Sequence, residues 1–493
     1  MIAALVEAML PAACVVGGAG WCAAWLLRAL GMRWIWALAA FPAGLLLRGT
    51  GVTLPLWLAA CVAAYAGARM ERRGAPARQL LGEVAGGGEL VAGVSHDGRP
   101  VPIGVGAKAG SHVLVVGATG SGKTVSEAWI CSNLVAAGRA AVAIDPKGDA
   151  DLRAALADAA RRRGARFAEW TPEGPLAYNP YAVGSAAEVA DKALAAEDFT
   201  EPHYLRQAQR YLGHAARAMR GAGVVITPAS LLEHMDPRRL EETVRSLAEP
   251  QATVTHAYLD GLTERQLREL AGVRDRLAVL VESELGEWLE PSGAGALELE
   301  TALRERAVVY VRLDADRRPL LARMLGTALI CDLVAISARA QRDPLDAVVV
   351  VDEFAAVAAA AVARLFGRAR SAGITLVLGA QEFADLRGAA GFSIRDQVLG
   401  NVGTVIAHRQ LVPDSAALVS RLAGRHAQWT TTYHTGAGPL RSRIVRRRAR
   451  RSELVPRIEP EEIANLAVGQ AVVIRPGSVP VIARIHRPPP AAL

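Results

Sequence analysis

The chain has 493 residues, of which 52% are hydrophobic, and a formal net charge of +8. This length predicts two or three domains, and the hydrophobic content is high for a purely soluble protein, so we expect a segment in lipid. The five scattered cysteines include no Cys-x-x-Cys pair, which argues against a disulfide framework and a zinc site, and the positive charge permits an anionic partner without identifying one.

The N-terminal region contains long apolar segments. Residues 8–27 and 49–68 are uncharged and each is about 20 residues long, the length of a helix that crosses a bilayer. Residues 34–47 are also uncharged but shorter, and they form either a third span or an interfacial segment. Arg69, Arg72 and Arg73 follow, and the positive-inside rule places this end and everything after it in the cytoplasm. The sequence therefore predicts a multi-pass protein of the inner membrane.

A phosphate-binding loop lies between a predicted strand and a predicted helix. After the apolar residues HVLVV, the sequence GATGSGKT fits the Walker A pattern in its strand-loop-helix context. In such a loop the backbone N–H groups surround the phosphates, the lysine reaches the terminal phosphates and the last hydroxyl can hold Mg²⁺. ATP and Mg²⁺ are thus the predicted cofactors. The predicted nucleotide-binding residues are Gly117, Ala118, Thr119, Gly120, Ser121, Gly122, Lys123 and Thr124, with Thr124 also a magnesium ligand.

Lys147 is one of only four lysines in a chain that has 52 arginines. It follows the predicted strand AVAID within the sequence IDPKGD, at the edge where an open α/β sheet binds its ligands. A compact ammonium is not interchangeable with a planar guanidinium. Lys147 is therefore predicted to support the phosphate site electrostatically, and the alternative is an ion pair with Asp149 or Asp151.

A second acidic motif follows the buried strand predicted at residues 347–351. In an ATPase, Asp352 occupies the Walker B position and holds Mg²⁺, and Glu353 orients or deprotonates the attacking water. A further apolar strand, residues 374–378, leads to Gln381, which either senses the γ-phosphate or caps the next helix. Three arginines on the short helix before it, Arg364, Arg368 and Arg370, are typical of a solvated face.

The stretch between Asp145 and Asp352 is much longer than one βαβ step needs, which indicates an insertion. Its pattern is helical: Asp236-Pro237 caps one predicted helix, and Thr263 opens another. The predicted fold is α/β, a RecA-like P-loop NTPase domain with an inserted all-helical domain, preceded by a transmembrane region of two or three helices. The predicted boundaries are a transmembrane region at 1–73, the first ATPase part at 74–185, the helical insertion at 186–295 and the second ATPase part at 296–493.

In this order, the membrane segments, GATGSGKT, IDPKGD, YNPY, VVVVDEF, GRARSAGITLVLGAQ and NVGTVIAHRQ resemble a type IV secretion coupling protein, the TraG/TraD-type ATPase of conjugation, in the FtsK/HerA superfamily of P-loop motors. The resemblance covers nearly the whole chain. It implies a ring of six subunits that passes DNA, often with a bound relaxase, to a secretion channel, and a helical insertion that selects cargo. It also implies that Arg370 acts on the nucleotide of the neighbouring subunit.

The resemblance thus implies a membrane-anchored, DNA-stimulated ATPase with Lys123, Glu353, Gln381 and Arg370 as catalytic residues. The alternative is a membrane receptor that docks relaxase or protein cargo and uses nucleotide only as a switch. The loop between the predicted spans is shorter than is usual in the family, and no long acidic tail follows the last strand. The dense arginine run from Arg441 to Arg451 is either a solvated loop or a DNA contact.

Overall fold

The structure is a computed structural model, and it describes residues 53–74, 88–106, 112–196, 199, 201–291, 295–357, 359–386, 394–436 and 445–488, with scattered residues between 16 and 40. The chain forms two compact units. One comprises Met1–Leu81 with Val94–Pro100, and the other comprises Gly82–Gly93 with Val101–Leu493.

The first unit contains helix α3, Thr53–Gly74, which includes residues 53–68 of the second predicted membrane segment. Within it, Leu54–Ala66 is apolar but shorter than a membrane span. In the described part of the chain one helix is long and apolar enough to cross a bilayer, and this is α13, Pro319–Arg339, which is mostly buried in the second unit. The predicted segment at 8–27 is described only in part, and nearly all of 34–47 lies outside the described residues.

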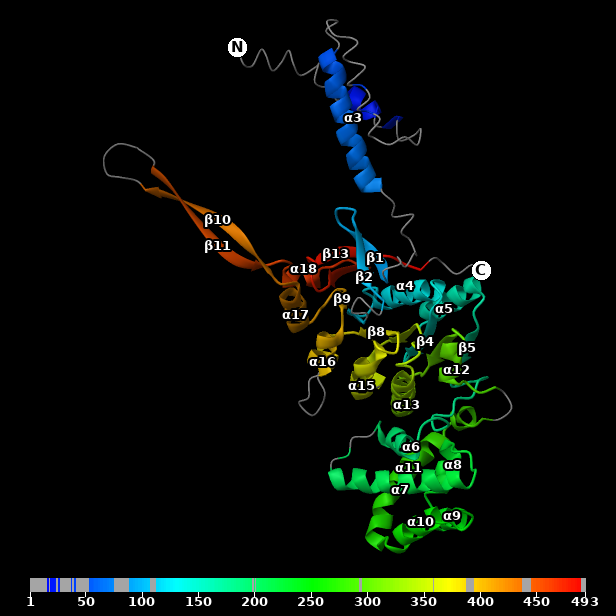
Figure 1. The fold of residues 1–493 in the computed structure, drawn as a ribbon. Coiled ribbons are helices and arrows are strands. Elements are labelled where there is room, and N and C mark those ends of the chain that lie inside the picture. The colour runs from blue at the N-terminus through cyan, green and yellow to red at the C-terminus, as the bar shows by residue number, and fades with distance from the viewer. Residues whose placement is uncertain are drawn as a thin grey trace. The chain divides into compact units, whose positions relative to one another are not determined.

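The second unit is built on a large mixed sheet (Figure 1). Its described strands are β1 Glu89–Ser95, β2 Pro100–Gly104, β3 Val113–Val116, β4 Ala140–Asp145, β5 Phe167–Trp170, β6 Val308–Arg312, β7 Ala347–Val351, β8 Ile374–Ala380, β9 Thr404–Ala407, β12 Gln470–Ile474 and β13 Val481–Ile485. They lie in the order β2-β1-β13-β12-β9-β3-β8-β7-β4-β6-β5. The seven strands from β9 to β5 in this order are parallel to one another, whereas β12 is antiparallel to both β9 and β13.

The central strands are continuous apolar runs because helices cover both faces of the sheet. Every residue of β4 and β7 is buried, as expected for parallel strands packed on two sides. Helices α4, Lys123–Ala136, and α5, Ala150–Arg163, pack on one face. On the other face pack α12, Leu299–Arg304, α13 and α15, Ala359–Ala369 (Figure 1). The predicted α/β class is therefore confirmed, and the sheet is large and mostly parallel.

Between β5 and β6 the described chain forms helices with a hydrophobic core of their own. These are α6 Ala186–Leu194, α7 Pro202–Gly221, α8 Pro228–Glu233, α9 Pro237–Val244, α10 Gln251–Asp260 and α11 Glu264–Val281. As predicted, Asp236 caps α9 and Thr263 caps α11 with its side chain. A buried ion pair of 2.7 Å between Lys192 and Asp332 joins α6 to α13. The four-part division drawn from the sequence stays a prediction.

Strands β10, Arg425–Gly436, and β11, Val445–Pro456, form a separate two-stranded ribbon outside the large sheet (Figure 1). Helix α17, Pro413–Ala423, precedes the ribbon, and α18, Pro460–Ala464, follows it. Residues 445–451 of the arginine run therefore belong to a strand, and of the two alternatives the loop does not apply to them. Residues 441–444 lie outside the described part.

Candidate nucleotide site

The phosphate-binding loop connects β3 to α4 at the carboxyl edge of the parallel sheet. Gly122 precedes the first helical residue with φ 108°, a left-handed conformation that glycine adopts without strain. The loop is held from both sides, because Gly117 N donates to Ala380 O at 3.2 Å and Ala118 N donates to Arg409 O at 3.0 Å. Helix α4 thus begins at Lys123, and the free N–H groups of a helix N-terminus are suited to binding a phosphate.

Lys123 is buried and its amino group donates a hydrogen bond to Asp352 Oδ1. Glu353 Oε1 lies 3.9 Å from the same nitrogen. Burial lowers the pKa of Lys123, but the nearby carboxylates, first Glu127 and then Asp352, outweigh burial and raise the pKa to about 12. Burial raises the pKa of the Asp352 carboxyl, and the charge of Lys123 offsets only part of this increase. Lys123 is therefore charged at neutral pH, and its amino group lies beside the carboxylates of Asp352 and Glu353.

Glu353 receives two further contacts on one oxygen. Lys147 Nζ lies 2.5 Å from Glu353 Oε1, and Gln381 Nε2 donates to the same oxygen at 2.5 Å. The backbone of Glu353 is left-handed, with φ 43°, which is an uncommon conformation for a residue other than glycine. Strain of this kind persists where the surroundings impose it, and it gathers at functional sites. The structure therefore brings Lys147 and Gln381, both predicted from sequence, to the predicted base.

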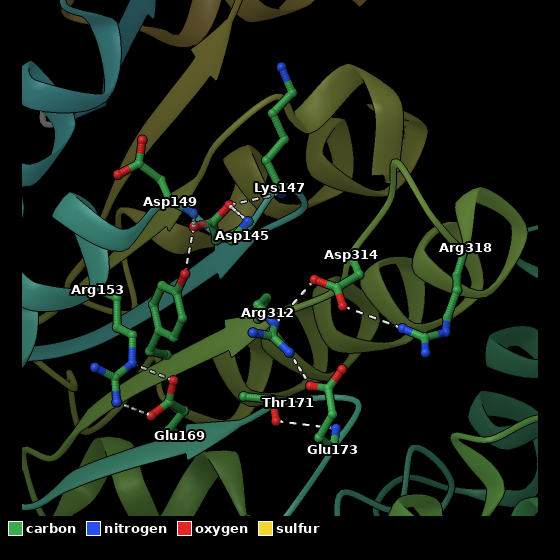
Figure 2. A network of polar contacts seen from close by, with 12 residues as sticks. Asp145, Lys147, Asp149, Arg153, Glu169, Thr171, Glu173, Arg312, Asp314 and Arg318 are labelled. Carbon is green, nitrogen blue, oxygen red and sulfur yellow. Dashed lines mark hydrogen bonds and ion pairs between the residues drawn. The ribbon is translucent and has the colours of Figure 1, made fainter.

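The loop after β4 explains why Lys147 reaches Glu353. The carboxylate of Asp145 accepts hydrogen bonds from the backbone N–H groups of Lys147, Gly148 and Asp149 at 2.6 to 2.9 Å, and from Tyr310 Oη at 2.7 Å. Asp149 in turn caps α5. Figure 2 shows the Lys147 side chain pointing away from these acids. The partner of the Lys147 side chain is Glu353, and neither Asp149 nor Asp151, the predicted alternatives, takes that place.

The residues predicted to hold Mg²⁺ fit an ion that is shared with phosphates. Thr124 and Asp352 both line the same cavity. No group of three or more acidic, histidine or cysteine side chains suited to a metal occurs in the described part of the chain. Mg²⁺ commonly binds through one or two protein oxygens together with substrate phosphates and water. Thr124 and Asp352 would therefore hold the ion only together with the nucleotide.

The cavity at the loop has a volume of about 350 Å³. The predicted residues Ala118, Thr119, Gly120, Gly122, Lys123, Thr124, Lys147, Asp352, Glu353 and Gln381 line it. The sequence did not assign the other lining residues to the site. These are Val125 and Asp149, and a group in or next to the C-terminal hairpin formed by β12 and β13: Val468, Gly469, Ile485, His486 and Arg487. Gly469 N donates to Ser121 O at 2.9 Å and so joins the hairpin to the loop. A cavity of about 480 Å³ in the helical insertion contains none of the predicted site residues.

His408 is a further residue that the sequence did not identify as part of the site. It follows β9 and is fully buried, with Nε2 2.8 Å from Ser126 Oγ and Nδ1 2.9 Å from Gln470 O. Burial lowers the pKa of His408 to about 4, so the ring is neutral at neutral pH. The ring thereby joins the start of α4 to the C-terminal hairpin. The sequence contains one indication of a role for His408, which is that it lies within NVGTVIAHRQ, one of the segments that resemble coupling proteins.

Glu127 lies on α4 beneath the loop and has no exposed surface. Neither of its side-chain oxygens has a hydrogen-bond partner among the described residues. Burial, and then the charge of Asp352, raises the pKa of the Glu127 carboxyl well above its usual range. A Cβ on Gly379 would lie 2.3 Å from Glu127 Oε1 and 2.5 Å from Asp352 Oδ1. The absence of a side chain at Gly379 therefore lets the two carboxylates converge.

Arg370 is not part of the cavity wall in its own subunit. It follows α15 and precedes β8, so it lies at the amino end of a strand whose carboxyl end carries Gln381. Burial, and then the charge of Arg370, lowers the pKa of His112 to about 4, and His112 precedes the parallel neighbour β3. The structure therefore does not bring Arg370 to the cavity of its own chain, and its action on a neighbouring subunit stays a prediction.

A parallel sheet that carries a phosphate loop at its carboxyl edge, opposite an Asp-Glu strand end, defines the class of P-loop nucleotide-binding proteins. Residues 99–486 match the family described as the type IV secretion-system coupling protein DNA-binding domain. The chain belongs to this family of coupling proteins, as the resemblance in its sequence indicated. A comparison with curated proteins gives no match.

Solved structures share the fold at low sequence identity. The unbound bacterial conjugative coupling protein TrwBdeltaN70 is 16% identical, with a TM-score of 0.56 over 84% of this chain and 91% of that chain. The plasmid coupling protein TrwB in complex with ADP and Mg²⁺ is 18% identical, with a TM-score of 0.54 over 82% of this chain and 91% of that one. VirB4 of Thermoanaerobacter pseudethanolicus is 15% identical, with a TM-score of 0.54 over 82% and 98%.

Proposed function

We propose that this chain is a membrane-anchored ATPase that uses ATP hydrolysis to recruit DNA, or DNA with a bound relaxase, and to move it to a type IV secretion channel. One observation carries the proposal: Lys123, Asp352, Glu353, Gln381 and Lys147 converge on one cavity at the phosphate loop. Family membership supplies the cargo and the channel, and the solved structure of TrwB with ADP and Mg²⁺ supports the choice of ligands.

Each side chain has a role that its contacts support. Lys123 contacts the terminal phosphates in place of Asp352, since a phosphate is a stronger counterion for a lysine ammonium at a helix start. Glu353 accepts the proton of the attacking water. Gln381 and Lys147, both in contact with Glu353 Oε1, fix the direction of that carboxylate. Mg²⁺ between Thr124 and Asp352 would neutralise charge on the transferred phosphoryl group.

The assembly and the location are parts of the same proposal. The position of Arg370 at the opposite edge of the sheet supports a ring in which each site is completed by a neighbour, and the resemblance of the sequence to coupling proteins implies six subunits. The apolar N-terminal segments support a multi-pass anchor in the inner membrane with the ATPase part in the cytoplasm. We keep the predicted division into a transmembrane region, two ATPase parts and a helical insertion that receives cargo.

The decisive measurement is steady-state ATP hydrolysis by the full-length chain in detergent, with and without DNA of increasing length. A pump hydrolyses continuously, and its rate rises with added DNA. A docking receptor that uses nucleotide as a switch hydrolyses about one ATP for each cargo molecule that it binds. A hydrolysis rate that DNA does not raise, together with one ATP hydrolysed for each cargo molecule, would reject pumping.

A further inference from the structure

The ribbon of β10 and β11 has two faces whose composition differs. Its strands pair in antiparallel register from Arg425 opposite Pro456 to Gly436 opposite Val445, and each extends for 12 residues. At about 3.3 Å per residue the ribbon is roughly 40 Å long. Successive strand residues alternate between faces, and directly opposed residues share one. The register therefore assigns each residue to a face.

One face, named here the aromatic face, gathers the basic and aromatic positions. It holds the opposed pairs Trp429 with Ser452, Thr431 with Arg450, Tyr433 with Arg448 and Thr435 with Arg446. The other face holds Gln428 with Glu453, Thr430 with Arg451, Thr432 with Ala449 and His434 with Arg447. The aromatic face thus has three arginines and no acid over these pairs, whereas the other face has two arginines and one glutamate.

Trp429 is 66% exposed, which is a large accessible surface for an indole ring. Packing in the hydrophobic core does not explain a tryptophan at residue 429, because the ribbon lies outside the large sheet. Trp429 and Tyr433 lie on one strand roughly 13 Å apart. Aromatic rings at such positions stack on unpaired bases, and arginines beside them neutralise the phosphates that link those bases. A duplex offers the phosphates but keeps its bases stacked inside.

We propose that the aromatic face of the ribbon binds single-stranded DNA, with Trp429 and Tyr433 as stacking positions and Arg446, Arg448 and Arg450 as phosphate contacts. The match of residues 99–486 to a family described as a DNA-binding domain includes both strands, and this favours nucleic acid over an anionic membrane. The inference rests on the proposed function, which identifies DNA as the cargo. It adds a DNA-binding surface that is separate in sequence from the nucleotide-binding motifs.

The test measures binding of a fluorescein-labelled oligothymidylate to the full-length chain in detergent, without nucleotide, between about 50 and 200 mM salt. Arg446→Gln with Arg448→Gln removes two charges from the aromatic face. Arg447→Gln with Arg451→Gln removes two charges from the other face and is the matched control. We expect the first variant to reduce the slope of log affinity against log salt by about 1.4 and the control to change it much less. Trp429→Ala should weaken binding roughly tenfold.

Three results would overturn the proposal: equal losses in the two double variants, no loss in either, or the same loss on a duplex of equal charge. A membrane role is tested by the quenching of Trp429 fluorescence, which is the part of the tryptophan signal that Trp429→Phe lacks. Quenching of this signal by oligothymidylate is compared with quenching by brominated phosphatidylglycerol vesicles. Quenching by the vesicles alone would assign the face to lipid. Binding is measured without nucleotide, so this test is independent of ATP hydrolysis. If the wild-type chain binds DNA through this face but DNA does not stimulate its hydrolysis, the proposal of a DNA pump is rejected and the proposal of a DNA-binding face is retained.

Discussion

Lys147 and Glu353 form an ion pair of 2.5 Å that links the loop after β4 to the end of β7. The Glu353 side chain is largely buried, whereas that of Lys147 is 38% exposed. The pair places a compact ammonium against the predicted base of the reaction, in a chain that otherwise uses arginine for nearly all of its cations.

Lys147→Arg should therefore lower the rate of ATP hydrolysis while leaving the melting temperature unchanged, because a planar guanidinium does not reproduce the geometry of the ammonium on Glu353 Oε1. Lys147→Ala should lower the rate at least as far. Both variants are compared with wild type by steady-state hydrolysis and thermal unfolding. A wild-type rate in the arginine variant would reject the role of Lys147 in the site.

Lys123 and Glu353 should separate binding from turnover. Lys123→Ala removes a phosphate contact and should weaken nucleotide binding. Glu353→Gln removes the base and should keep binding while lowering turnover by about 10² to 10⁴-fold. Binding of a fluorescent ATP analogue and steady-state hydrolysis measure the two effects. If Glu353→Gln still hydrolyses ATP, the assignment of the base is wrong.

Arg370 should act across a subunit interface. Arg370→Ala alone should lose about 10³-fold or more in rate. Mixing Arg370→Ala subunits with Glu353→Gln subunits should restore part of the activity, because some interfaces then combine an intact Glu353 with an intact Arg370. Mixed rings are verified by pulling down one tagged variant. Activity no higher than that of the parent variants in verified mixed rings would contradict the trans role.

Gly379→Ala should destabilise the protein and impair nucleotide binding. The added Cβ would lie 2.3 Å from Glu127 Oε1 and 2.5 Å from Asp352 Oδ1, so the two carboxylates must separate. Overpacking of this kind costs about 1–3 kcal/mol. Gly367→Ala on α15 is the matched control, because its added Cβ has nothing within 4 Å and alanine favours the helix. Equal melting temperatures for the two variants would show that the close approach at Gly379 is unimportant.

His408 should make stability depend on pH. Its folded pKa of about 4 lies below the ordinary value of 6.5, so between these values the unfolded chain binds more protons than the folded one. The contribution of the neutral ring is complete above pH 6.5 and is lost as the pH falls towards 4, by about 3 kcal/mol in total. The difference in melting temperature between wild type and His408→Gln should therefore be smaller at pH 5 than at pH 7.5. A difference that is the same at both pH values would mean that His408 does not titrate as the structure implies.

Local patterns in the sequence were sufficient for the phosphate loop, the apolar strands and the helix caps. GATGSGKT, the valine run before Asp352 and the caps at Asp236 and Thr263 each depend on neighbours within a few residues, because backbone conformation and burial period are set over that distance. The sequence by itself therefore determined the α/β class, the helical insertion between β5 and β6, and the positions of the candidate site residues at strand ends.

The order of strands in the sheet decided which of those residues meet. Lys123 and Asp352 are 229 residues apart in sequence, and Ser126 and His408 are 282 apart. The first pair meets because β8 lies between β3 and β7 in the sheet, and the second meets because β9 pairs directly with β3. No period or motif encodes such a contact, since it results from packing the whole sheet. For the same reason only the tertiary structure placed Lys147 on Glu353 and paired residues 445–451 of the arginine run with β10 in a ribbon.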